Sequence, residues 1–384
     1  MPSDPVDDVQ LRVTIRPDFE TGPRVLRSAD LFSGCGGLTL GLAQACLDGG
    51  IALDIRLAVD SDPDAIAVYK ANFPKACACF SDIHEFFDGA LGAPPSPSEV
   101  ATRKNIGDVD VVVAGPPCQG HSDLNNHTRR NDPRNLLYLR VVRAIEILRP
   151  KAVVVENVPT VQHDLNRVVE TASAHLESLG FRVADRSIRV DALGVPQLRR
   201  RHVLLGLAQT IDASPLTILE VVAARRSESR NLRWAIGDLA NIENPTGLDI
   251  APRASATNIA RMEWLLSHGE YNLPNSLRPK CHQDSNHSYH SMYGRLNWNA
   301  PAQTITSGFG SVGQGRYMHP DKPRALTPHE AARIQGIPDY FDFSVSPRRE
   351  ALARMIANAV PPPLGRAIFK ELVPILEIDT EQTR

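Results

Sequence analysis

The sequence contains few cysteines, and none of them has the spacing of a zinc site. Six Cys occur in 384 residues and none forms a C-x-x-C pair, so we expect neither a disulfide scaffold nor a metal site but a reduced, intracellular protein. No stretch approaches the roughly 18 uninterrupted apolar residues of a membrane span. The N-terminus lacks a basic region followed by an apolar run. We therefore expect no signal peptide and no membrane association.

The chain also has almost no net charge. Lys plus Arg is 42 and Asp plus Glu is 44, which gives −2 and excludes a globally basic nucleic-acid-binding protein. A local basic face remains, because residues 182–233 contain ten Arg and five acidic residues, and such a face can steer a polyanion. The hydrophobic content of 42% is ordinary for a globular protein and excludes wholesale disorder.

Short apolar segments alternate with helix-like segments. The predicted strands are 25–32, 55–60, 109–114, 152–155 and 202–207, and the predicted helices include 37–47, 327–336 and 362–377. Continuous β-branched runs separated by helices favour an α/β fold with a doubly wound, mostly parallel sheet. Residues 90–107 contain three prolines, and we predict a surface loop there.

The length suggests two domains. We predict a main domain over residues 24–207 that is completed by residues 324–384. Residues 208–323 are poorer in alternation and richer in Asn, His, Gly and Pro, and we expect them to form a smaller domain. Residues 1–23 are polar and partly acidic, which predicts a loose leader.

Glycine and acidic residues follow the predicted strands, where parallel sheets bind their ligands. Residues 34–37 (GCGG) allow close approach of a ligand to the backbone, although a tight strand–helix turn explains them equally well. Asp60, 23 residues beyond Gly37, ends the next strand and can accept both hydroxyls of a ribose. Together they indicate a nucleoside-bearing cofactor. Asp82 and Ile83 could hold an adenine, or form a surface turn.

Three further positions suit covalent chemistry on a ring. Two prolines before Cys118 fix the backbone, which favours a nucleophile over a buried structural Cys, although its thiolate fraction must be raised. Glu156 ends a strand 38 residues on. It can protonate a ring nitrogen if burial raises its pKa from about 4.3 to near 7, or it can cap a helix. Gln197, Arg199 and Arg201 alternate along a strand and either converge on one site or form an exposed basic end.

Six segments resemble, in order, the motif series of DNA (cytosine-5)-methyltransferases: DLFSGCGGLTLGL (30–42), GPPCQGHS (115–122), ENVP (156–159), QLRRR (197–201), LTPHEAARIQGIPDYF (326–341) and IANAVPP (356–362). The resemblance spans about residues 24–370. No single motif is decisive, but their combination is specific. A dehydrogenase, which the glycine cluster alone would also suit, does not explain the PPC and ENV segments.

The resemblance implies a Rossmann-like methyltransferase that uses S-adenosylmethionine. The implied cofactor-binding residues are Phe32, Gly34, Cys35, Gly37, Asp60, Asp82, Ile83, Gly115, Pro116, Leu137 and Asn358. Because Asn358 comes from the far end of the chain, the C-terminal segment should fold back onto the first domain.

The resemblance also implies methylation of carbon 5 of cytosine in a specific duplex DNA sequence. Cys118 would attack carbon 6 of a flipped base, and Glu156 would protonate ring nitrogen 3. Arg201 and Arg199 would hold the base carbonyl or position the nucleophile loop. Residues 119–136 resemble the mobile loop that closes over the base.

Residues 208–323 correspond to the family's target-recognition domain. The implied DNA-binding residues are Gln119, Ser122, Arg129, Arg130 and Thr304. We expect a monomer that acts on double-stranded DNA in the cytoplasm of a prokaryotic cell, or is encoded by a phage. A cognate restriction endonuclease is the further expected partner.

The sequence departs from the family pattern at two positions, with His121 in place of Phe and Ala357 in place of Gly. Two other functions compete with the main one. A catalytically silent DNA-binding homologue is disfavoured by the intact Cys118, Glu156 and Arg201. A tRNA cytosine methyltransferase is disfavoured because the Cys-Phe-Thr tripeptide of those relatives is absent.

Overall fold

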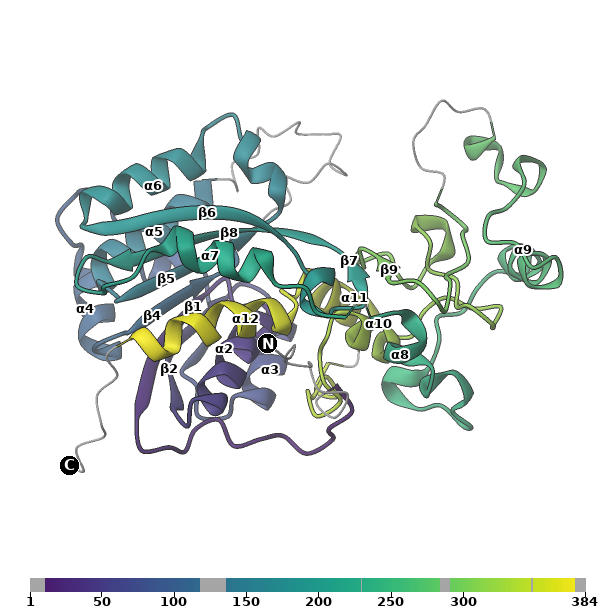
Figure 1. Ribbon diagram of the computed structural model, residues 1–384, viewed down its shortest axis with the longest axis horizontal. Helices are drawn as coiled ribbons and strands as arrows, with labels where there is room; N and C mark the ends of the chain where they lie inside the picture. The colour runs from purple at the N-terminus through teal and green to yellow at the C-terminus, as the bar shows by residue number, and fades with distance from the viewer. Residues whose placement is uncertain (1–10, 118–135, 229, 284–290, 347, 377–384) are drawn as a thin grey trace.

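The computed structural model describes residues 11–117, 136–228, 230–283, 291–346 and 348–376. Its larger part is a sheet with helices on both faces, and a smaller lobe extends to one side of it (Figure 1). This layered arrangement confirms the predicted α/β fold.

Among the described residues, seven strands form one sheet in the order β3-β2-β1-β4-β5-β8-β6. The strands are β1 (Val25–Leu31), β2 (Ala52–Asp60), β3 (Ala78–Phe80), β4 (Val111–Ala114), β5 (Ala152–Asn157), β6 (Phe181–Arg189) and β8 (Arg200–Ala208). Strands β1 to β5 pair in parallel, and β8 runs antiparallel to both of its neighbours. The sheet is thus mostly parallel, as predicted. The strand order reverses between β1 and β4, which is where such sheets bind ligands.

Two apolar cores cover the sheet. One face carries α2 (Gly37–Asp48), α3 (Pro63–Asn72), α7 (Pro215–Ala224) and α12 (Pro362–Leu372); the other carries α4 (Pro97–Ile106), α5 (Leu137–Leu148) and α6 (Val168–Ser178). Along β4, Val111 and Val113 belong to the first core and Val112 and Ala114 to the second, which explains why this strand is apolar at every position. No helix of the described residues is long and apolar enough for a bilayer span.

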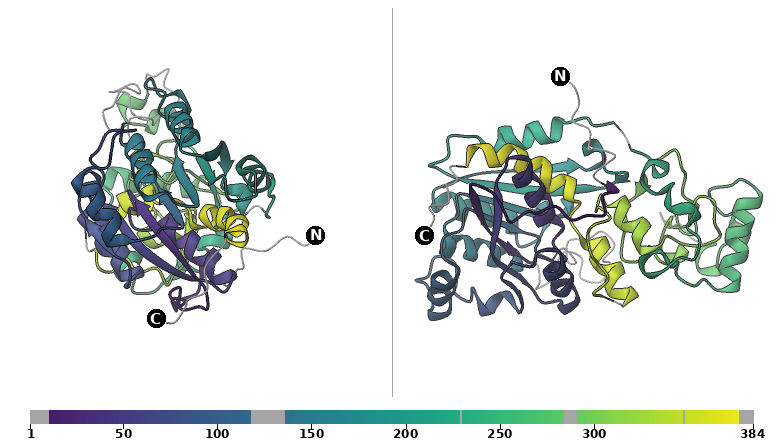
Figure 2. Two further views of the ribbon diagram at one scale, coloured as in Figure 1. Left: turned by 90° about the vertical axis from the view of Figure 1, so that its left-hand side faces the viewer. Right: turned by 90° about the horizontal axis from the view of Figure 1, so that it is seen from below.

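Helix α12, late in the chain, lies against α2, which follows the first strand of the sheet. Figures 1 and 2 show α12 beside α2, and the two helices share one of the most extensive contacts in the fold. A Cβ built on Gly41 would come within 2.5 Å of the Pro362 carbonyl oxygen. The late sequence motif therefore packs directly on the early one.

Residues 90–107 are not a loop throughout, so this prediction was wrong for their second half. Ser96 caps α4, since its hydroxyl accepts from the Glu99 N–H while the Glu99 carboxylate accepts from the Ser96 N–H. Pro97 occupies the first turn, where the lack of an N–H costs nothing. The last proline of the run therefore marks a helix start.

Residues 11–23 are not a loose leader either. The side chains of Leu11 and Phe19 are only 4% and 2% exposed, and the Asp339 N–H donates to the Leu11 carbonyl oxygen at 3.0 Å. The prediction was wrong here because two apolar anchors outweigh the polar composition. Residues 1–10 lie outside the described part of the chain.

The smaller lobe contains α9 (Ala256–Ser267) and much irregular chain. Its own core is Met262, Leu265, Leu273, Val312, Met318 and Ala325. By contrast, α7 packs against β6 and β8, so residues 215–224 lie with the sheet. The division into a main domain and a target-recognition domain over 208–323 remains a proposal. Because α7 packs on the sheet, the target-recognition domain would begin after this helix.

Polar contacts join α10 (Pro328–Ile334) to two other segments of the chain. The Nδ1 of His329 lies 2.8 Å from Asp249 Oδ1, and its Nε2 lies 2.9 Å from Asp339 Oδ1. Both ring nitrogens must donate to these carboxylates, which requires the protonated imidazole. Burial opposes this charge, but the two carboxylates outweigh burial and raise the pKa of His329.

Candidate active site

The turn after β1 has an unusual backbone. Its φ angles are 56° at Phe32, 53° at Gly34 and 94° at Gly36. A positive φ costs a non-glycine residue about 1–3 kcal/mol and is concentrated at functional sites. A Cβ built on Gly34 would meet nothing within 4 Å, so this turn borders open space that a ligand can enter.

Asp60, at the end of β2, is bound to this turn. Its Oδ2 accepts from the Gly34 N–H and its Oδ1 from the Asp62 N–H, both at 2.8 Å. Burial raises the pKa of Asp60, and these N–H groups counteract it. Each carboxylate oxygen keeps a further lone pair, so Asp60 can still accept from the hydroxyls of a ligand.

A buried network fixes the same turn. The Thr39 hydroxyl of α2 donates to Asp30, and the Tyr69 hydroxyl of α3 donates to Thr39 at 3.1 Å. Burial raises the pKa of Asp30 to about 7, against the hydrogen bond from Thr39. The sequence alone does not indicate this network, because only the fold brings the three residues together.

Cys35 faces away from the open side of the turn. Its Sγ lies 3.9 Å from the Met355 carbonyl oxygen in α11 (Arg349–Asn358). Burial raises the pKa of Cys35 to about 12, so it remains a thiol and cannot serve as a nucleophile. Only its backbone is available to a cofactor.

The segment after α11 closes this side of the site. A Cβ built on Gly37 would lie 2.5 Å from the Val360 carbonyl oxygen, so a side chain at residue 37 would displace that segment. The Arg354 guanidinium donates twice to Asp62, at 3.0 and 2.6 Å. These contacts hold the end of α11, where Asn358 has an exposed side chain.

Glu156 and Arg201 form an ion pair at the carboxyl end of β5. Arg201 Nε lies 2.6 Å from Glu156 Oε1, and the two side chains are 12% and 10% exposed. Burial raises the pKa of Glu156, while Arg201 and His202 lower it less than burial raises it. Glu156 therefore takes up a proton at a higher pH than a free glutamic acid does.

Gly115 and Pro116 lie next to both the glycine turn after β1 and the end of β5. A Cβ built on Gly115 would lie 3.8 Å from the Phe32 carbonyl oxygen and 3.9 Å from Glu156 Oε2. The Asn157 amide donates to the Pro116 carbonyl oxygen at 3.2 Å. The glycine turn, the acid and this segment therefore meet at one place. The following predicted residues lie outside the described part of the chain: Cys118, Gln119, His121, Ser122, Arg129 and Arg130.

Arg199 does not contact Glu156 as Arg201 does. The chain passes at Arg199 from β7 (Gln197–Leu198), which pairs with β9 (Ala302–Gln303), into β8 of the large sheet. Its buried guanidinium donates to the carbonyl oxygens of Ile305 at 3.2 Å and Ala357 at 2.9 Å. The alternation predicted for Arg199 and Arg201 assumed one continuous strand, and it fails because the strand is interrupted at Arg199.

Ala357 fits its position without strain. It lies within α11 and is absent from the residues with positive φ, so the glycine that is usual there is not needed. The Gln335 amide also donates to the Ala357 carbonyl oxygen, at 3.2 Å. The role of Gln335 is not visible in the sequence, because its partners come from distant segments.

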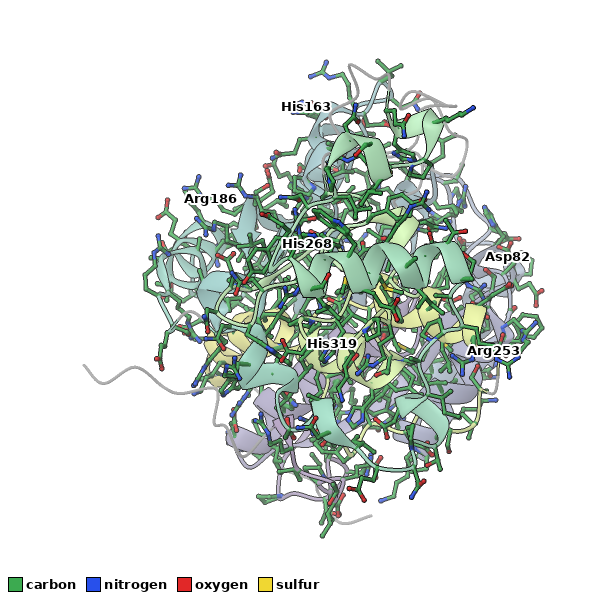
Figure 3. The ribbon with its side chains drawn as sticks, turned by 90° about the vertical axis from the view of Figure 1, so that its right-hand side faces the viewer. Asp82, His163, Arg186, Arg253, His268 and His319 are labelled. Atoms are coloured by element: carbon green, nitrogen blue, oxygen red, sulfur yellow. The ribbon has the colours of Figure 1, made fainter. Side chains whose placement is uncertain are left out.

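The structure also describes the predicted residues Asp82, Ile83 and Leu137. Asp82 caps η1 (Ile83–Glu85) and is 64% exposed, near the outline of the molecule in Figure 3. Hydrogen bonds from the backbone and ring of His84 lower the pKa of Asp82. Ile83 is buried, and Leu137, the first residue of α5, is half-buried.

Thr304 is half-buried and directly follows β9 of the small β7–β9 sheet. Its hydroxyl donates to the Leu198 carbonyl oxygen at 2.9 Å, and a hydroxyl used in this way can still accept one hydrogen bond. No group of three or more His, Cys, Asp or Glu residues with the geometry of a metal site occurs within the described ranges.

The doubly wound sheet and the glycine turn with its carboxylate are typical of Rossmann-like enzymes that bind a nucleoside cofactor. Residues 26–374 match the family model of the C-5 cytosine-specific DNA methylases. The chain belongs to this family and is a DNA (cytosine-5)-methyltransferase. Family and fold imply S-adenosylmethionine as the methyl donor.

Individual relatives agree with this assignment. The chain is 42% identical over 360 residues to the Type II methyltransferase M1.BsuMI of Bacillus subtilis, covering 94% of this chain and 83% of that protein. It is 30% identical over 361 residues to the Type II methyltransferase M1.HphI of Haemophilus parahaemolyticus, covering 92% and 87%.

Two solved structures share the fold. A putative DNA modification methyltransferase encoded within an E. coli prophage gives a TM-score of 0.63 at 24% identity and covers 91% of this chain and 99% of its own. The S. pombe Dnmt2 methyltransferase gives 0.64 at 18% identity and covers 92% and 100%.

Proposed function

We propose that this enzyme methylates cytosine through a covalent bond between Cys118 and carbon 6 of a flipped base. The observation that carries the proposal is the buried Glu156–Arg201 pair beside the segment that leads into Cys118. Carbon 5 of cytosine is a poor nucleophile until a thiolate adds to carbon 6. Together with a general acid of suitable pKa, this addition replaces one high activation barrier with smaller ones.

The edge of the sheet suits S-adenosylmethionine. The position of Gly34 is open, Asp60 retains acceptor capacity, and the buried Ser33 hydroxyl has no hydrogen-bond partner among the described residues. We assign the turn at Phe32, Gly34, Cys35 and Gly37 to the methionine and adenine portions, Asp60 to the ribose, and Asp82 with Ile83 to the adenine. Gly115, Pro116, Leu137 and Asn358 complete the proposed pocket. When bound, the cofactor supplies an electrophilic methyl group.

The protein's residues carry the other steps. The Cys118 thiolate bonds to carbon 6 while Glu156 gives its proton to ring nitrogen 3, and carbon 5 thereby becomes the nucleophile that takes the methyl group. The carbon-5 proton is then lost to solvent, the C–S bond breaks, and nitrogen 3 returns its proton to Glu156. Arg201 holds the acid in place throughout. The raised pKa of Glu156 suits a general acid near neutral pH.

Carbon 6 is inaccessible in a stacked duplex, so the base must leave the helix at a cost of a few kcal/mol. We assign closure over the base to residues 119–136, and DNA contacts to Gln119, Ser122, Arg129, Arg130 and Thr304. Arg199, held among backbone carbonyls, would act by positioning the C-terminal segment. The Type II relatives favour a cognate restriction endonuclease as a partner, and we expect a monomer.

Replacing the nucleophile tests this mechanism. Cys118→Ala should abolish methyl transfer to DNA, measured with a labelled methyl donor, while binding of S-adenosylmethionine in calorimetry is retained. Cys77→Ala is the matched control, because Cys77 is an exposed thiol with no proposed role. Substantial turnover by Cys118→Ala would rule out the covalent route.

A further inference from the structure

A polar cluster beside the acid contains groups that none of these steps uses. His202 of β8 is fully buried, and its Nε2 lies 2.9 Å from Asp185 Oδ2 in β6. The same oxygen accepts from the Gln162 amide at 2.7 Å. Gln162 belongs to η3 (Pro159–His163). One carboxylate oxygen therefore joins three elements.

The proposed acid lies on β5 and its arginine on β8, each close in sequence to one group of this cluster. His202 follows Arg201 directly and is the cross-strand partner of Asn157, which follows Glu156. Gln162 stands six residues after Glu156, in the short helix that begins just beyond the ENV motif. Because the Asp185 carboxylate binds both segments, it restrains the distance between Arg201 and Glu156.

The charges around Glu156 determine how this restraint affects its pKa. Arg201 and His202 face it from β8 and lower its pKa. Tyr138 faces it from α5, and burial together with the charges of Asp185 and Glu156 raises the pKa of this phenol. The hydrogen bond from His202 lowers the pKa of Asp185, so Asp185 is the ionised acceptor of the cluster at neutral pH.

We propose that Asp185 is a positioning residue that keeps Arg201 against Glu156 by holding His202 and Gln162 on one oxygen. This inference rests on the proposed role of Glu156 as proton donor. Loss of the restraint has two effects. The acid is misaligned, which slows the chemical step, and Arg201 moves away from it, which raises the pKa of Glu156. Cofactor binding is spared because β4, β5 and β8 separate β6 from β1.

The test compares Asp185→Ala with Asp185→Asn over a pH series of single turnovers at saturating DNA. Asp185→Ala should lower the rate about tenfold or more, since small misplacements of catalytic groups have effects of this size. Its KM for S-adenosylmethionine should be unchanged, and the alkaline limb of its pH profile should move to higher pH. Asp185→Asn should restore most of the rate, because an amide oxygen can accept both hydrogen bonds.

The matched control is Glu220→Ala, which removes an exposed carboxylate 2.6 Å from Arg186, the neighbour of Asp185 in β6. It should behave as the unchanged enzyme. A normal rate and pH profile for Asp185→Ala would overturn the inference. So would a loss of rate that leaves the profile unmoved or that Asp185→Asn does not restore, because a merely structural role gives that result.

Glu156→Gln, measured in parallel, separates the two hypotheses. An inactive Glu156→Gln beside a normal Asp185→Ala overturns only the positioning role. A fully active Glu156→Gln overturns the proton-donor role and the positioning role with it.

Discussion

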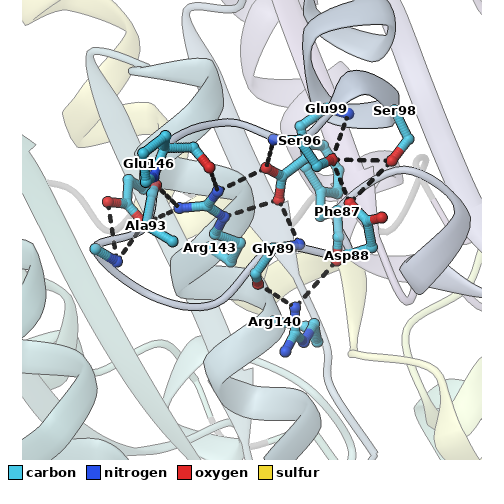
Figure 4. Close-up of polar contacts among 12 residues, drawn as sticks. Phe87, Asp88, Gly89, Ala93, Ser96, Ser98, Glu99, Arg140, Arg143 and Glu146 are labelled. Carbon is cyan, nitrogen blue, oxygen red and sulfur yellow. Dashed lines mark hydrogen bonds and ion pairs between the residues drawn. The ribbon is translucent and has the colours of Figure 1, made fainter.

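Glu99→Gln should destabilise the protein strongly, because it removes half of a buried ion pair. Glu99 and Arg143 are 0% and 1% exposed. Arg143 Nε donates to Glu99 Oε1 at 2.7 Å and Nη2 to Oε2 at 2.6 Å, as Figure 4 shows. Burial alone would raise the pKa of Glu99, but the hydrogen bonds and charge of Arg143, together with hydrogen bonds from the Ser96 and Gly89 N–H groups, outweigh burial and lower the pKa.

The surrounding contacts set the magnitude. Arg143 also donates to Glu146 at 2.8 Å and to the carbonyl oxygen of Ala93 at 2.9 Å. Its buried charge therefore remains partly paired when the Glu99 charge is lost. Breaking a buried pair costs about 3–5 kcal/mol. Because Glu146 remains, we expect a loss of about 3 kcal/mol in the free energy of unfolding, at the lower end of that range.

Urea unfolding followed by circular dichroism measures this loss. The matched control is Glu220→Gln in the exposed pair with Arg186, whose side chains are 52% and 46% exposed; it should cost less than about 1 kcal/mol. A loss below about 1 kcal/mol for Glu99→Gln would refute this reasoning.

Three further outcomes are expected. His329→Gln should destabilise the protein most below about pH 6.5, the pKa of an unfolded histidine; the deficit should shrink as pH rises through the raised folded pKa, and a deficit in urea unfolding that grows with pH would contradict this sign. Gly37→Ala should weaken binding of S-adenosylmethionine in calorimetry, because its Cβ would lie 2.5 Å from the Val360 carbonyl oxygen; unchanged affinity would show that the segment yields freely. Ala357→Gly should not raise activity and should cost up to about 1 kcal/mol of stability, as expected within a helix, and a gain in turnover would mean that the alanine is a defect.

The sequence predicted the central strands because they are continuous apolar runs. It missed β3, which has three residues, and β6, whose side chains are mostly half-buried or exposed. An edge strand that is buried on one side has no continuous apolar run. Its sequence therefore does not predict a strand, and the strand forms because the neighbouring strand offers pairing partners. The helix start at Ser96 was visible in the sequence as a capping pattern, but the prolines obscured it.

The sequence correctly placed Asp60 and Glu156 at the ends of strands. The partners of those residues were not predictable, because they arise from tertiary packing. Arg199 and Arg201 looked equivalent in the sequence, yet only Arg201 reaches the acid, since the chain changes sheets between them. Asp185 gave no signal at all, because its two partners are distant in sequence.

The most direct test of the central claim is a duplex in which 5-fluorocytosine replaces the target cytosine, after the target site has been mapped by bisulfite sequencing. Fluorine blocks the final proton loss, so the enzyme and S-adenosylmethionine should give a stable adduct that carries one methyl group, mapped by mass spectrometry to Cys118. Full turnover on ordinary DNA without any such adduct would contradict the account.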